Sequence, residues 1–166
     1  MKQPYTCYAI DLSTRRTLEG VTGGYEFPRR HATHITELHD VEDARSLRPV
    51  REAEIYGFVS DNKGIEAFVA RIGGEAVSRD GRYYHLTWSS NPNVEIPPIY
   101  RQFEMAPDAA PGGRIFYNAR HANAMLCALF DQRAGFVSMH EFSQPIVVAV
   151  KPLLFRPTPE QPRLTI

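Results

Sequence analysis

Alternating apolar and polar positions mark a series of short strands along the chain. The segments share tyrosine, β-branched or other aromatic residues in short runs, which is the composition that strands favour. They cover residues 5–12, 54–60, 82–88, 114–117, 136–142 and 146–150. The segment from Tyr100 to Ala106 is also expected to be extended.

Helical periodicity is present in three other stretches. Apolar residues recur at intervals of three within residues 35–53 until Pro49, so we expect one or two short helices there. Asp61–Asn62 can cap a helix whose apolar side would lie within residues 65–72. The strongest helical stripe runs through residues 119–134.

Glycine and proline separate these elements. Gly23–Gly24 and Pro28 predict a turn with extended flanks within residues 20–30. Residues 152–166 form a proline-rich C-terminal tail, which we expect on the surface without a packed element. No repeat or change of composition divides the chain. The mixture of strands and helices therefore predicts a single α+β domain over residues 1–166.

Composition restricts the class of protein. Of the 166 residues, 43% are hydrophobic and 11% aromatic, which excludes a disordered chain. Lys and Arg number 19 and Asp and Glu number 19, so no net charge attracts the protein to nucleic acid or to an anionic membrane. We therefore expect no membrane or nucleic-acid partner, and function must be inferred from local features.

Cysteine usage and the first residues restrict the location. Cys7 and Cys127 are the only two cysteines, which excludes a disulfide framework, and they lack the spacing of zinc ligands. A single bridge between them is one alternative, and two buried thiols are the expected one. The first residues lack the apolar stretch of a signal peptide, and no apolar run reaches the ~18 residues of a membrane span. We expect a soluble protein that is cytoplasmic or is secreted as an effector without a cleavable signal peptide.

A polar pair is predicted in the segment from Tyr100 to Ala106. In a strand, residues i and i+2 lie on the same face, so Gln102 and Glu104 would point together while Phe103 and Met105 face the other way. Such a pair can serve acid–base or electrostatic chemistry if its neighbours form a site.

The order of several motifs along the chain points to one family. The segments are Tyr8-Ala9-Ile10-Asp11, Gly23-Gly24-Tyr25-Glu26-Phe27-Pro28-Arg29, Tyr56-Gly57-Phe58-Val59-Ser60-Asp61-Asn62, residues 82–94, and Gln102-Phe103-Glu104 followed by Gly112-Gly113-Arg114-Ile115. In this order they resemble the A subunits of the cholera and heat-labile enterotoxin class, within the mono-ADP-ribosyltransferase superfamily. The resemblance covers roughly residues 5 to 117 and implies a split, mostly antiparallel β core with flanking helices.

The resemblance implies a reaction and its residues. The nicotinamide glycosidic bond of NAD is cleaved, and ADP-ribose is transferred to an unidentified macromolecular acceptor, by preference a protein. Glu104 would stabilise the positive charge that develops on the ribose. Gln102 stands where arginine-specific members carry glutamate, so an acceptor other than arginine is expected. Ser60 would present its hydroxyl to the glutamate or to the nicotinamide side. These three are the expected catalytic residues of an effector or toxin domain.

The resemblance also implies where NAD is bound. The cleft would be bordered by residues near Tyr8, Ser60, Tyr84 and Glu104. The expected NAD-binding residues are Tyr8, Asp11, Arg15, Arg29, His39 and Tyr84.

One position departs from the family pattern. Ala9 stands where the family carries the arginine that binds the NAD phosphates. Either another arginine, such as Arg15, Arg16 or Arg29, supplies this charge, or the chain is an inactivated variant, or the fold is retained without catalysis. Glu141, in Met139-His140-Glu141-Phe142, is a rival catalytic glutamate.

Two other functions compete with the transferase. The first is a metal hydrolase, because His31, His34, His39 and Asp40 include suitable zinc or iron ligands. The second is a non-catalytic binding module that uses the cleft or the proline-rich tail to hold a protein partner, a hypothesis that Ala9 favours.

Overall fold

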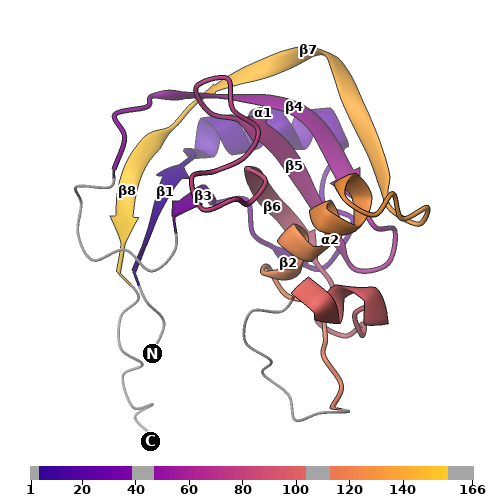
Figure 1. The fold of residues 1–166 in the computed structure, drawn as a ribbon. Helices are drawn as coiled ribbons and strands as arrows, with labels where there is room; N and C mark the ends of the chain where they lie inside the picture. The colour runs from indigo at the N-terminus through magenta and orange to yellow at the C-terminus, as the bar shows by residue number, and fades with distance from the viewer. Residues whose placement is uncertain (1–3, 39–46, 104–112, 157–166) are drawn as a thin grey trace, which may run out of the picture.

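The described part of the chain folds into two α-helices, a 3-10 helix and eight strands (Figure 1). The computed structural model describes residues 4–38, 47–103 and 113–156. The elements, in chain order, are β1 (Tyr5–Ala9), α1 (Leu12–Thr22), β2 (Arg29–Arg30), β3 (His34–Leu38), β4 (Glu52–Ser60), β5 (Ile65–Arg71), β6 (His85–Ser90), the 3-10 helix η2 (Pro98–Phe103), α2 (His121–Phe130), β7 (Ser138–Ala149) and β8 (Lys151–Phe155).

All strand pairings are antiparallel, and the strands form one eight-stranded sheet in the order β7-β4-β5-β6-β3-β1-β8, with β2 added beside β6. The predicted α+β class with a mostly antiparallel sheet is therefore confirmed. The strands join into a single sheet rather than two, and the narrowest junction is between β3 and β6, where Ile35 pairs with Leu86.

The sheet is strongly curved because one stretch of chain supplies both of its edges. Strand β7 pairs with β4, β8 pairs with β1, and only Val150 separates β7 from β8. Figure 1 shows this stretch crossing over the top of the molecule. The Val150 amide donates to the Arg51 carbonyl at 2.9 Å, at the point where the two edges meet.

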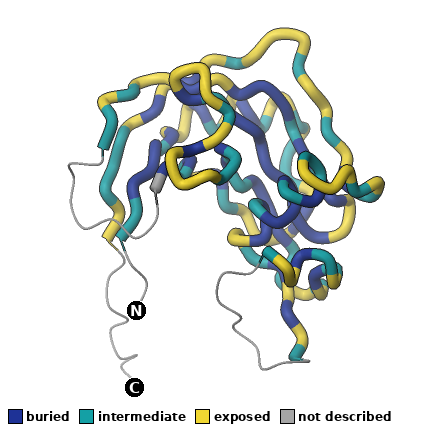
Figure 2. Tube along the Cα trace, viewed as in Figure 1, coloured by how far each residue is buried: buried dark blue, intermediate teal, exposed yellow. Residues whose placement is uncertain are grey.

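Two apolar cores lie on opposite faces of the central strands. Strand β5 shows the division, because Phe68 and Ala70 belong to the core beneath α1, whereas Ala67 and Val69 belong to the core beneath α2 and η2. A strand that is buried on both faces reads as a continuous apolar run. Figure 2 shows the central strands buried and the crossing stretch of β7 exposed.

The predicted helix over residues 65–72 is wrong, because this segment is strand β5. Asp61 caps a tight turn instead of a helix: its Oδ1 accepts hydrogen bonds from the backbone amides of Lys63, Gly64 and Ile65 at 2.9–3.1 Å. Asn62 has a φ of 60° in this turn, which lets β4 and β5 form a hairpin.

Other predictions differ in part. The described residues of the stretch 35–53 contain most of β3 and the first residues of β4 instead of a helix. Residues 39–46 lie outside the described ranges. The stripe at 119–134 is confirmed as α2. The strands predicted at 136–142 and 146–150 are one strand, β7, with a register shift opposite Tyr56. The prediction that the tail has no packed element is wrong for its first residues, because residues 152–155 belong to β8 and pair with β1.

Helix α1 was not among the predicted elements. Asp11 caps it, since the Asp11 Oδ1 accepts a hydrogen bond from the Thr14 amide at 2.8 Å, and Gly23 ends it with a φ of 76°. Within the described residues, no helix is both long enough and apolar enough to cross a membrane.

Candidate functional site

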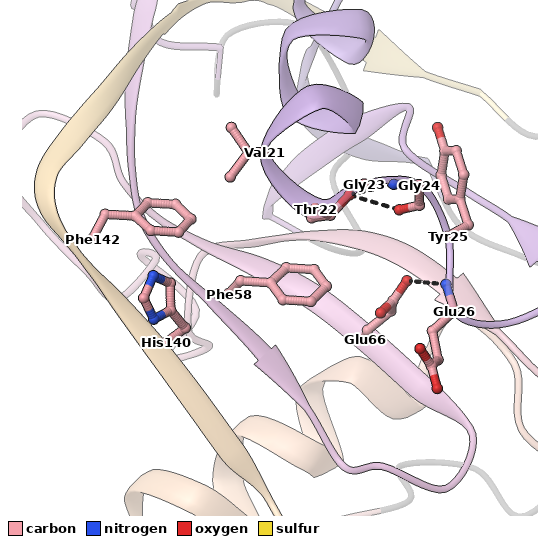
Figure 3. A pocket seen from close by; sticks show the side chains of 10 residues that line it. All are labelled: Val21, Thr22, Gly23, Gly24, Tyr25, Glu26, Phe58, Glu66, His140 and Phe142. Atoms are coloured by element: carbon pink, nitrogen blue, oxygen red, sulfur yellow. Dashed lines mark hydrogen bonds between the residues drawn. The ribbon is translucent and has the colours of Figure 1, made fainter.

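A pocket of about 480 Å³ lies between the end of α1 and the sheet (Figure 3). Its volume is in the range of small-ligand sites, roughly 300–1,000 Å³. We call it the glycine-loop pocket. It is lined by Val21, Thr22, Gly23, Gly24, Tyr25 and Glu26 from the end of α1 and the following loop, and by Phe58, Glu66, His140 and Phe142 from β4, β5 and β7.

Glu66 is the most buried polar group of this pocket, with 4% of its surface exposed. Its Oε1 accepts two hydrogen bonds, from the Ser89 hydroxyl at 2.7 Å and from the Glu26 amide at 3.0 Å. Burial raises the pKa of the Glu66 carboxyl, and these two hydrogen bonds offset the increase only in part.

Ser60 lies on the same face of the sheet as this pocket. Ser60 pairs directly with Glu66 on β5 and with Ser138 on β7. Directly paired residues point to the same face, and so do residues two apart on a strand, such as Phe58 and Ser60. The Ser60 Oγ accepts a hydrogen bond from the Asn62 amide at 3.0 Å. Strand pairing therefore brings a hydroxyl and a carboxylate side by side.

Asp61, next in the chain, has a structural role. It is fully buried, and besides the three backbone amides it accepts hydrogen bonds on Oδ2 from the Tyr100 hydroxyl at 2.8 Å and the Tyr117 hydroxyl at 2.5 Å. Burial raises the pKa of Tyr100 and Tyr117, and the Asp61 charge raises both further. Asp61 thus fastens η2 to the end of β4.

Gln102 is exposed on η2, so the predicted extended conformation from Tyr100 is wrong as far as Phe103. Proline at 97 and 98 favours the tight helical turn over a strand. The Gln102 amide nitrogen donates to the Ile99 carbonyl at 3.0 Å and to Gln132 Oε1 at 3.3 Å. Glu104 lies outside the described residues, as does His39.

Tyr8 and Tyr84 are brought together, but away from the glycine-loop pocket. Both are 1% exposed, and they lie beside buried Glu37. The Tyr84 hydroxyl donates to Glu37 and accepts from Arg48 Nη2 at 2.7 Å, while Arg79 Nε lies 2.8 Å from Glu37 Oε1. Since Val69 pairs with His85 and Glu66 with Ser89, Tyr84 and Ser60 lie at opposite ends of the sheet. The fold does not bring the predicted cleft residues Tyr8, Tyr84 and Ser60 together.

The remaining predicted NAD-binding residues are also dispersed. Asp11 caps α1, and its hydrogen bonds with Thr14 hold the pKa of its carboxyl below the ordinary value. Arg15 Nε donates to the Ala32 carbonyl at 3.2 Å. Arg29 is exposed on β2 and pairs with Ser90, at the end of the sheet that carries Glu66 and Ser60.

The rival glutamate, Glu141, is exposed on β7. Its neighbour His140 lines the glycine-loop pocket, and successive residues of a strand point to opposite faces. Glu141 therefore faces away from this pocket, toward the side of Tyr56, whose pKa it helps to raise.

The histidines proposed as metal ligands have other partners where they are described. His31 Nε2 lies 2.9 Å from the Ser90 hydroxyl, and His34 Nδ1 lies 2.7 Å from the Thr33 hydroxyl. Within residues 4–38, 47–103 and 113–156, no three histidine, cysteine or acidic residues are placed to hold a metal. His39 and Asp40 are outside these ranges.

Sequence reasoning missed Glu66 and His140. Both lie in strands where the alternation of residues, once the strands are known, directs them to the pocket face. A search of known proteins adds no functional residue, because no protein-family model, no curated protein and no solved structure matches this chain.

Proposed function

We propose that this chain is an NAD-dependent ADP-ribosyltransferase that binds NAD in the glycine-loop pocket and modifies an acceptor other than arginine, by preference a protein. The observation that carries the proposal is the convergence of two motif segments. Gly23–Gly24 and Phe58 line one pocket, and Ser60 lies on the same face of the sheet, paired with Glu66. These segments are separate motifs in the sequence, so their proximity is independent support.

The pocket suits one half of a dinucleotide. Its walls include Phe58 and Phe142, which offer apolar aromatic surface to a ligand ring. Arg29 and Arg30 follow the same loop and are exposed, and the Arg30 guanidinium carbon lies 4.6 Å from the centre of the Tyr25 ring. These arginines would bind the diphosphate, in the role of the arginine that Ala9 replaces.

The reaction leaves the protein unchanged. The bond between the ribose C1′ and the pyridinium nitrogen breaks, and its electron pair goes to that nitrogen, so nicotinamide leaves as a neutral molecule. The acceptor nucleophile forms a bond to C1′ and loses one proton to solvent. A carboxylate facing C1′ stabilises the charge that develops there, the role that the resemblance gives to Glu104, and the Ser60 hydroxyl would orient the ribose.

The proposal is tested by release of nicotinamide from NAD, with and without a lysate as source of acceptor. We expect turnover by the wild-type chain, and about 10²-fold or greater loss in Glu104→Gln. Glu141→Gln is the matched control, because Glu141 is exposed and faces away from the pocket, and its turnover should match the wild type.

Each other outcome identifies an alternative. Loss of turnover in Glu141→Gln but not Glu104→Gln would exchange the roles of the two glutamates. A thermal shift with NAD but no turnover would support a binding module without catalysis, and would refute the transferase. Stabilisation by zinc and not by NAD would favour the metal hydrolase.

A further inference from the structure

Three carboxylates are buried in the described part of the chain, and they differ in how their charge is compensated. Glu37, 2% exposed, has two arginines, Arg48 and Arg79, each with its Nε 2.8 Å from Oε1. Asp61, fully buried, accepts hydrogen bonds from three amides and two hydroxyls. A buried charge is costly unless it is paired or fully hydrogen-bonded, and these two meet that requirement.

Glu66 does not meet it. Its two hydrogen bonds both end on Oε1, and no lysine or arginine of the described residues forms an ion pair with it. In Figure 3 its carboxylate borders the open space of the glycine-loop pocket. A glutamine could accept the same two hydrogen bonds without burying a charge, so the hydrogen bonds alone do not explain a carboxylate here.

The other residues that line the pocket also leave the negative charge of Glu66 without a positive partner. The lining contains two carboxylates, of Glu26 and Glu66, and no lysine or arginine. Phe58 and Phe142 supply aromatic rings to the lining. The Tyr25 ring is already engaged, because it stacks on Trp88 with the ring centres 4.5 Å apart and the Arg30 guanidinium carbon lies 4.6 Å from its centre. Aromatic faces beside a carboxylate form the surroundings that organic cations prefer.

We propose that the glycine-loop pocket is a binding site for a flat organic cation, with Glu66 as its counter-ion. The pocket would therefore hold the pyridinium end of NAD and not its diphosphate, an assignment that rests on the proposed function. It also accounts for product release: nicotinamide becomes neutral when the glycosidic bond breaks, and so loses its attraction to Glu66.

A pair of nearly isosteric probes tests this inference without turnover. 1-Methylnicotinamide is a permanent cation, and nicotinamide is its neutral counterpart. By calorimetric titration we expect the wild-type chain to bind the cation at least about tenfold more tightly, and Glu66→Gln to remove most of that preference. The affinity for neutral nicotinamide should stay the same in both proteins.

Two further variants separate the contribution of the Glu66 charge to binding from that of the aromatic surface. Glu26→Gln changes the other carboxylate of the lining, which is exposed, and should alter the affinity for the cation by less than about threefold. Phe142→Leu removes one aromatic wall and should weaken binding of both probes alike. An unchanged cation preference in Glu66→Gln, or equal wild-type affinity for the two probes, would overturn the inference.

Acidification provides a second readout. The cation affinity of the wild type should fall as Glu66 becomes protonated, whereas that of Glu66→Gln should not show this loss. Glu26, Tyr25 and His140 also face the pocket, and they are present in both proteins, so the difference between the two profiles isolates Glu66. A common profile would count against the counter-ion role.

The two proposals can fail separately. Cation selectivity that depends on Glu66, without any NAD turnover, would refute the transferase and keep the cation site. Turnover of NAD without cation selectivity would keep the transferase and refute Glu66 as the counter-ion.

Discussion

Asp61 shows how one residue can join three segments. Its two oxygens hold the turn after β4, Tyr100 of η2 and Tyr117, which precedes α2. Asp61→Ala leaves those donors buried without an acceptor, so we expect the free energy of unfolding to fall by about 3–5 kcal/mol. Urea denaturation measures this loss. A stability within about 1 kcal/mol of the wild type would contradict the structural role.

Unlike Asp61, which stabilises the fold, Glu66 should lower the free energy of unfolding at neutral pH. Burial raises the pKa of its carboxyl, so the folded protein keeps this proton at pH values where the unfolded chain has lost it. The free energy of unfolding therefore decreases as pH rises from the ordinary glutamate pKa, about 4.3, through the raised pKa of the folded state.

Glu66→Gln removes this decrease. Relative to the wild type, its unfolding free energy should increase as the pH rises from the ordinary glutamate pKa through the raised pKa of the folded state, and should remain constant above it. Urea titrations of both proteins at several pH values provide the measurement, and the difference between them cancels every other titrating group. A difference that does not change with pH would show that Glu66 titrates normally.

The β4–β5 hairpin is limited by the space at its turn. A Cβ added at Gly64 would lie 2.2 Å from a ring carbon of Tyr117, whose hydroxyl is held by Asp61. The ring cannot move aside without breaking that bond, so Gly64→Ala should lower the free energy of unfolding by about 3 kcal/mol. Gly20→Ala is the matched control.

Gly20 lies within α1 and has no atom within 4 Å of an added Cβ. Alanine there should stabilise the helix by about 0.5–1 kcal/mol. Thermal melts of the two variants should shift in opposite directions. An unchanged or raised melting temperature in Gly64→Ala would refute the close packing of the turn against Tyr117.

The sequence predicted some elements and missed others for physical reasons. Helix α2 could be recognised because it is a long run of strong helix formers, mainly alanine, leucine and methionine. Strand β5 is buried on both faces, so its unbroken apolar run fits a helix as well as a strand. That ambiguity also hid Glu66: in a helix it would lie among solvated positions, and in the strand it faces the pocket. The turn at Gly23–Gly24 could be predicted because turn chemistry is local, whereas Ser60 was selected only through the resemblance to a family.

The curvature of the whole sheet could not be predicted from local sequence patterns. It depends on Val150 joining two edges, and on β8 pairing with β1 almost the full length of the chain away. Proline-rich composition from residue 152 favours an exposed tail, yet Pro152 and Leu153 pair with Tyr8 and Cys7. Proline is tolerated at the start of an edge strand, where its missing amide costs no ladder bond.

Two cysteines, Cys7 on β1 and Cys127 on α2, can report whether β8 stays paired with β1. Cys7 is 2% exposed on β1 opposite Leu153, and burial raises its pKa to about 11. Cys127 lies half-buried on α2, and burial raises its pKa to about 11 as well. Both thiols should therefore react slowly with maleimide in the folded protein, because the thiolate is the nucleophile.

A chain that ends at Val150 lacks β8 and leaves β1 as an open edge next to Cys7. We expect maleimide labelling of Cys7, followed by peptide mass spectrometry, to become at least about tenfold faster, while labelling of Cys127 on α2, which packs on β5 and β6, changes little. Light scattering should also detect association, because an unpaired strand can pair with a second copy. Equal acceleration at both cysteines would instead show that the two cores open together, so that β8 stabilises the whole molecule and not only the edge formed by β1.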